Sequence, residues 1–135
     1  MKQKLFLDTN IVIDFLARRE EFQSAANILQ LGMENKVDLY ITGLTVANIT
    51  YILRSQLGKD KVKDVLYSLC SFIHIAPITE NETSKAFETE NPDLEDAIQY
   101  YSAVSVSADY IITRDPKHFK FSAIPVVNGR EYLNK

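Results

Sequence analysis

Three acidic residues lie at positions from which their carboxylates could bind one divalent cation. Asp8 directly follows a short apolar run, Asp96 lies near the start of a predicted helix, and Asp115 closely follows a second apolar run. If their oxygens meet about 6 Å apart, the three pairs repel by about 8 kcal/mol at an effective dielectric constant near 20. This repulsion is comparable with the stability of a whole small domain, about 5–15 kcal/mol, so a proton or a cation must relieve it.

Relief by a cation would also bring chemistry to the cluster. Carboxylate oxygens are hard ligands, and they favour Mg²⁺ or Mn²⁺ over zinc. A cation held by carboxylates keeps open positions, so it can bind a phosphodiester, activate a water molecule and stabilise the developing charge. Hydrolysis of a nucleic-acid backbone is therefore the expected reaction class.

Each acidic residue also has an ordinary explanation when it is taken alone. Residues 8–10 (DTN) could end a strand and cap the following helix, because Asp, Thr and Asn all favour that place. Asp96 could be one of several acids that the dipole favours at a helix N-terminus. Asp115 precedes a proline, and this pair commonly opens a turn. The functional interpretation depends on all three standing beside apolar segments.

The elements that must position these residues alternate between short strands and amphipathic helices, which predicts βαβ units and a mostly parallel sheet. Sites in such sheets form at the carboxyl ends of the strands, where Asp8 and Thr113–Asp115 are expected. The predicted strands are 5–7, 37–41, 72–75, 110–113 and 125–127, and the predicted helices are 11–16, 22–33, 44 to near 58, 62–69, one capped by Thr79 with Glu82, and one after Pro92 that reaches Ala108.

Composition limits the class of protein. The chain has 135 residues, of which 46% are hydrophobic and 24% charged, so we expect a single globular domain over residues 1–135. Its 15 Lys and Arg against 18 Asp and Glu give a net charge of −3, so any nucleic-acid contact needs a local basic patch or a metal ion. The single cysteine, Cys70, suits a reducing cytoplasm, and no apolar run is long enough for export or for a membrane span.

A short basic and aromatic segment, residues 114–120, lies beside the last of the three acids. Arg114 and Lys117 are candidates for binding the phosphate backbone of a substrate, and Asn10 is a third candidate beside Asp8. Phe119 could stack on a base, but we favour the alternative in which it turns into the hydrophobic core.

Three segments, 5–10 (LFLDTN), 93–103 (DLEDAIQYYSA) and 108–115 (ADYIITRD), resemble the PIN domain family in their order and spacing. This family is the small nuclease fold found in the toxins of type II toxin–antitoxin pairs, the VapC-like proteins. The resemblance implies a three-layer α/β/α sandwich with a parallel sheet of about five strands. It also implies cleavage of RNA that depends on Mg²⁺ or Mn²⁺.

The resemblance further assigns roles and partners. It carries Asp8, Asp96 and Asp115 onto this chain as metal-site carboxylates, and it implies that the Thr113 hydroxyl orients a water molecule or an acid. It implies two protein partners as well. One is an antitoxin that inserts into the groove of the active site, and the other is a second copy of the chain.

One position departs from the family pattern. PIN domains usually place a glutamate on the helix after the second strand, within Thr-x-x-Glu, whereas residues 45–48 (TVAN) put Asn48 there. An amide oxygen can bind a hard cation, but it supplies no charge and cannot act as a base at neutral pH. Because Asn48 shares a predicted helix face with Leu44, Tyr51 and Ile52, we expect it to point inward, as a ligand or as a core hydrogen-bonding group. The alternative function is a catalytically weakened PIN-fold module that binds RNA or a protein.

Overall fold

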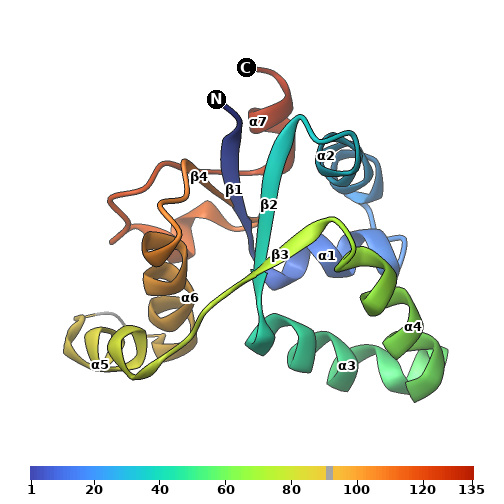
Figure 1. The fold of residues 1–135 in the computed structure, drawn as a ribbon, viewed down its shortest axis with the longest axis horizontal. Helices are drawn as coiled ribbons and strands as arrows, with labels where there is room; N and C mark the ends of the chain where they lie inside the picture. Colours follow the sequence, from blue (N-terminus) through green and yellow to red (C-terminus); the bar gives the residue numbers. More distant parts are fainter. Residues whose placement is uncertain (91–92) are drawn as a thin grey trace.

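The computed structural model describes residues 1–90 and 93–135, and its centre is a five-stranded sheet (Figure 1). Every neighbouring pair of strands is parallel, which confirms the predicted α/β fold. The strand order is β3-β2-β1-β4-β5, so the first strand of the chain lies in the middle. The strands are β1 (Gln3–Leu7), β2 (Val37–Thr42), β3 (Ile73–Ala76), β4 (Tyr110–Ile112) and β5 (Val126–Val127).

Helices cover both faces of this sheet and complete the predicted α/β/α sandwich. One hydrophobic core joins the sheet to α1, α2, α3 and α4, and a second joins the opposite face to α6 and to the 3₁₀ turn η1 (Figure 1). Helix α5 packs against α6, and α7 packs against α2. The helical elements are α1 (Thr9–Leu16), α2 (Phe22–Met33), α3 (Gly43–Leu57), α4 (Lys59–Leu69), α5 (Glu80–Glu88), α6 (Leu94–Ser105), η1 (Pro116–Phe119) and α7 (Gly129–Leu133).

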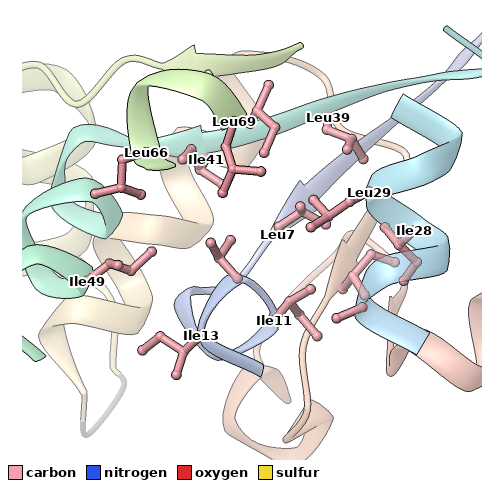
Figure 2. Packing of buried hydrophobic residues seen from close by; sticks show 14 of the residues in the cluster. Leu7, Ile11, Ile13, Ile28, Leu29, Leu39, Ile41, Ile49, Leu66 and Leu69 are labelled. Atoms are coloured by element: carbon pink, nitrogen blue, oxygen red, sulfur yellow. The ribbon is translucent and has the colours of Figure 1, made fainter. Parts of the chain in front are cut away.

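Strand β1 is apolar on both sides because it lies between two cores. Leu5 and Leu7 enter one core and Phe6 enters the other, as expected for alternate residues of a strand. Figure 2 shows Leu7 packed among side chains such as Ile11 of α1 and Leu29 of α2. The burial of three successive residues fixes the register of β1, and it therefore fixes where Asp8 leaves the sheet.

Two helices in the C-terminal part of the chain depart from the prediction. Helix α6 ends at Ser105 and does not reach Ala108, because Ser107 adopts a positive φ of 58°, which interrupts the helix. The start of α6 at Leu94 agrees with the prediction, although Pro92 itself lies outside the described residues. Helix α7 was not predicted, although its capping box formed by Asn128 and Glu131 is a sequence signal for a helix start.

Other features agree with the sequence. Thr79 and Glu82 form the predicted capping box at the start of α5. The prediction that Phe119 turns into the core is confirmed, because its side chain is buried against the face of the sheet that α6 covers. No helix within residues 1–90 and 93–135 is long and apolar enough to cross a membrane.

Candidate active site

The parallel pairing of β1 with β4 brings the first acidic residue against the end of the fourth strand. Leu7 and Ile112 are register partners, and the Asp8 backbone N–H extends this ladder by donating to the Ile112 carbonyl at 2.9 Å. One residue further, the Thr113 hydroxyl donates to Asp8 Oδ2 at 2.8 Å. Since both strands end at the same edge of the sheet, residues 105 positions apart in the sequence share this hydrogen bond.

The turn after β4 is fastened to the start of α1 by side chains that accept backbone hydrogen bonds. Asn10 Oδ1 accepts from the Arg114 N–H at 3.1 Å, and Asn10 Nδ2 donates to Asp8 Oδ2 at 3.3 Å. The Thr113 hydroxyl accepts from the Asp115 N–H at 3.2 Å while it donates to Asp8. Asn10 and Thr113 therefore orient the two acidic residues, and both side chains belong to the framework of the site.

Asp96 approaches the same place from α6, on the other side of the sheet edge. Its backbone N–H donates to the side chain of the N-cap residue Asp93 at 3.0 Å, which fixes the first turn of the helix. Burial, and after it the negative charges of Asp93 and Asp8, raise the pKa of Asp96 to about 6. Asp96 is thus close enough to Asp8 for the two carboxylates to repel each other.

The pKa of Asp8 is raised as well. Burial raises its pKa, and this effect exceeds the lowering caused by the hydrogen bonds from Thr113 and from the next backbone N–H. The charge of Asp115 raises the pKa of Asp8 as well, whereas His118 lowers the pKa values of both Asp8 and Asp96. Asp8 therefore stands in one negative field with Asp96 and Asp115. His118 follows Asp115 by three residues, but no sequence motif marks it as part of the site.

A cavity of about 510 Å³ opens beside this group and is lined by both acidic and basic side chains. Lys117, predicted from the sequence as a phosphate contact, is one of the basic residues. Such a cavity can receive a phosphate next to the acidic cluster, because the lysines attract its charge. The acidic lining residues are Glu90, Asp93 and Asp96, and Lys117, His118 and Lys120 also line the cavity.

Arg114 points into a different part of the molecule. Its Nη1 atom donates to Asp14 Oδ1 at 2.6 Å, and Asp14 is completely buried. Within the described part of the chain, the second carboxylate oxygen of Asp14 has no hydrogen-bond partner. The guanidinium of Arg114 lines a separate cavity of about 190 Å³ with Glu21 and Arg130. Arg114 and Lys117, which we expected to bind one backbone together, thus lie in separate cavities.

The prediction of which face of α3 points inward is wrong. The buried residues of α3 are Thr45, Ile49 and Leu53, which are spaced four apart, whereas Tyr51 is 71% exposed and Ile52 is 41% exposed. Hydrophobic periodicity indicates the other face because the inner face begins with a polar threonine. In the structure, the hydroxyl of this threonine has hydrogen-bond partners.

Asn48 consequently lies beside the inner face of α3, half-buried, and its amide Nδ2 donates to Glu95 Oε1 at 3.3 Å. Glu95 directly precedes Asp96 on α6. Asn48 thus reaches the helix that carries Asp96, and its contact there is with the neighbouring glutamate.

The donor set fits a hard cation held by two carboxylates. Mg²⁺ is usually bound by one or two protein carboxylates, while water and substrate phosphates complete its shell. Asp8 and Asp96 supply such a pair, and both have raised pKa values that a cation would lower. Among the residues that the structure describes, no group of three or more His, Cys, Asp or Glu side chains could surround one ion. Asp115 acts on this pair through its negative charge, which raises the pKa of Asp8.

The sequence pattern of the PIN domain family matches residues 4–117, which include all the acidic residues of this site. The chain belongs to the PIN domain family. PIN domains are generally nucleases, and they generally use divalent metal ions. No curated protein matches the chain.

Solved structures with the same fold are similar to this PIN domain over nearly their whole length. VapBC2 from Rickettsia felis, bound to a DNA fragment from its promoter, has a TM-score of 0.72 and 17% identity, with 93% of this chain and 98% of that chain covered. FitAcB from Neisseria gonorrhoeae has a TM-score of 0.65 and 22% identity, with 93% and 98% covered. DNA-bound VapBC from Salmonella typhimurium has a TM-score of 0.65 and 14% identity, with 94% and 98% covered. At these identities the likeness establishes the fold.

Proposed function

We propose that this PIN domain is a divalent-metal-dependent endoribonuclease that hydrolyses RNA phosphodiester bonds at Asp8, Asp96 and Asp115. The observation that supports this most strongly is the shared negative field at the end of β1. There the carboxylate of Asp8 is hydrogen-bonded to Thr113 and is repelled by the two other acidic residues. Family membership supports the nuclease class.

Each residue of the site has a separate role in this proposal. Asp8 and Asp96 hold Mg²⁺ or Mn²⁺, and Asp115 adds negative charge beside them. The Thr113 hydroxyl keeps Asp8 oriented by donating to its Oδ2 atom. Lys117, which lines the cavity, attracts the phosphate backbone. When bound, the cation would supply Lewis acidity, which lowers the pKa of a water ligand and neutralises phosphate charge.

We also propose that the protein is the toxin of a toxin–antitoxin pair and that its partner is a cognate antitoxin. The support is the similarity to the VapBC and FitAcB structures together with the VapC-like resemblance of the sequence. A second copy of the chain, which the same resemblance implies, stays a prediction.

The test is cleavage of a structured RNA by the purified protein with Mg²⁺ or Mn²⁺. We expect cleavage by the wild type, loss of cleavage in EDTA, and recovery when Mn²⁺ is added back. Asp8→Asn should lose cleavage, because it removes a charge from the cation-binding pair. The matched control is Asp64→Asn, which changes an exposed aspartate on α4 and should cleave as the wild type does. Equal rates for Asp8→Asn and the wild type would exclude Asp8 from the site.

A second candidate function is a weakened PIN-fold module that binds RNA or a protein without cutting. The observation that favours it is Asn48, which stands at the position where PIN domains usually have a glutamate. Its amide donates to Glu95. Expression of the chain by itself separates the two functions. A nuclease toxin should stop growth and be rescued by a small neighbouring gene product. A binding module should be harmless and should retain RNA or a partner on purification.

A further inference from the structure

A set of buried polar side chains lies under the acidic cluster and takes no part in the chemistry proposed above. Thr42 and Thr45 are fully buried at the start of α3, and Gln99 on α6 is 1% exposed. Burying a polar group is costly unless it is hydrogen-bonded. Their partners therefore decide how the surrounding elements fit together.

The amide of Gln99 joins α6 to the start of α3 with both of its polar atoms. Its Oε1 atom accepts from the Thr42 hydroxyl at 3.0 Å, and its Nε2 atom donates to the Thr45 hydroxyl at 3.2 Å. The Thr45 hydroxyl also lies 3.1 Å from the Thr9 hydroxyl, which extends the connection to the first residue of α1. The neutral side chain of Gln99 thus links α6 to α3 directly, and to α1 through Thr45.

Both ends of this network lie next to the facing carboxylates. Thr9 directly follows Asp8 and donates its backbone N–H to Asp8 Oδ1 at 2.8 Å. Gln99 follows Asp96 by three residues, so the two side chains are neighbours on the surface of α6. The network therefore ties α6, which carries Asp96, to the first residue of α1, which directly follows Asp8.

We propose that Gln99 is a positioning residue that holds Asp96 at the distance from Asp8 at which both carboxylates bind one cation. The inference rests on the proposed function, because the proposed function supplies the cation. The hydrogen bonds of Gln99 are formed within this chain. An amide suits the task because it accepts and donates at once without adding charge. A glutamate in its place would add a fourth acidic group beside the cluster, and a serine would be too short to reach both threonines.

The test compares Gln99→Met with Ser102→Ala. Methionine keeps the length and the burial of the side chain but removes both hydrogen bonds. Ser102 lies one turn further along α6, is also fully buried, and donates to the Pro77 carbonyl at 2.8 Å, away from the acidic residues. Each variant therefore loses buried hydrogen bonding on the same helix, but only Gln99→Met disconnects the turn that carries Asp96.

Three measurements separate positioning from a general structural role. Calorimetry with Mn²⁺ alone gives the metal affinity, kinetics on a short single-stranded RNA give kcat and KM, and amide hydrogen exchange reports on residues 94–99. For Gln99→Met we expect about tenfold or more weaker Mn²⁺ binding, a fall of similar size in kcat at unchanged KM, and faster exchange in the first turn of α6. For Ser102→Ala we expect Mn²⁺ affinity and kcat within about twofold of the wild type. Equal Mn²⁺ affinity in Gln99→Met and Ser102→Ala would overturn the proposal.

A second variant keeps the test decisive if Gln99→Met does not fold. Thr45→Val removes the central hydroxyl but keeps the shape of the side chain, and it should weaken Mn²⁺ binding and lower kcat in the same way. If the wild type neither binds Mn²⁺ nor cleaves RNA, the proposed function fails, and hydrogen exchange alone then decides the role of Gln99. Faster exchange at residues 94–99 in Thr45→Val than in Ser102→Ala would support positioning, and equal exchange would overturn it.

Discussion

Replacement of Arg114 by methionine should destabilise the protein strongly at neutral pH and much less in mild acid. Arg114 Nη1 lies 2.6 Å from Oδ1 of Asp14, a carboxylate with no exposed surface. Removal of one partner of a buried ion pair typically costs about 3–5 kcal/mol, because the other charge stays buried without compensation. The Arg114 side chain is 40% exposed, so water can reach its place, and we expect the lower end, about 3 kcal/mol. For a chain of this length, that loss lowers Tm by about 10 °C.

The pH dependence follows from the direction of the Asp14 pKa. Burial raises this pKa, and the charge of Arg114 counters part of the rise, so the pKa of Asp14 is higher still in Arg114→Met. A carboxyl group whose pKa is higher in the folded state than in the unfolded state disfavours folding above the unfolded value, about 3.9. The penalty begins to fall when the pH drops below the folded pKa and is gone near the unfolded value. The stability lost in Arg114→Met should therefore return progressively below neutral pH.

Thermal and urea unfolding between pH 4.5 and 8 measure both effects. The matched control is Arg130→Met, which removes an exposed ion pair of similar length, 2.8 Å to Glu21, and should cost less than about 1 kcal/mol at any pH. The double variant Asp14→Leu with Arg114→Met should recover most of the stability, because an apolar pair can replace a buried ion pair. A loss in Arg114→Met that is equal at pH 5 and pH 8 would refute the electrostatic reasoning.

Further predictions concern individual carboxyl groups. Asp96→Asn should raise Tm at pH 7.5 in EDTA, because burial and nearby charges raise the pKa of Asp96 to about 6 and its ionised form therefore disfavours the fold. The same variant should abolish Mn²⁺ binding, and a lower Tm would contradict the electrostatic reasoning. Glu82→Ala should lower Tm at neutral pH, and the difference should vanish in strong acid, because hydrogen bonds from Thr79 lower the Glu82 pKa; a difference that persists in acid would argue against it. Asn48→Glu should tighten Mn²⁺ binding severalfold in calorimetry and lower Tm in EDTA, because it places a carboxylate against Glu95; unchanged affinity would remove residue 48 from the site.

The framework of the site could be predicted because it depends on short local patterns. The apolar run of β1 ends before Asp8, and the apolar run of β4 ends before Thr113. The end of each apolar run therefore predicts which residue leaves the sheet. The rule that parallel strands end at one edge then brings the two residues together without further information. The acidic residue on α6 needed the family resemblance as well, since an acid at a helix start is common.

The parts that could not be predicted depend on partners that are distant in the sequence. Arg114 is 100 residues from Asp14, so nothing local shows that its guanidinium turns away from the cavity of Lys117. Thr45 can lie on the inner face of α3 because Gln99, 54 residues later, donates an Nε2 hydrogen bond to its hydroxyl. Hydrophobic periodicity assigns polar residues to the solvent side, and it therefore selected the wrong face of this helix.

The long sequence separation within the site has a consequence for synthesis of the protein. Asp8 is made early, but the Thr113 hydroxyl that orients it is 105 positions later and lies directly after β4. A nascent chain on the ribosome therefore carries its first acidic residue without the rest of the cluster. The cluster is completed only when β4 has emerged and added beside β1, so the complete site cannot form until most of the chain has been synthesised.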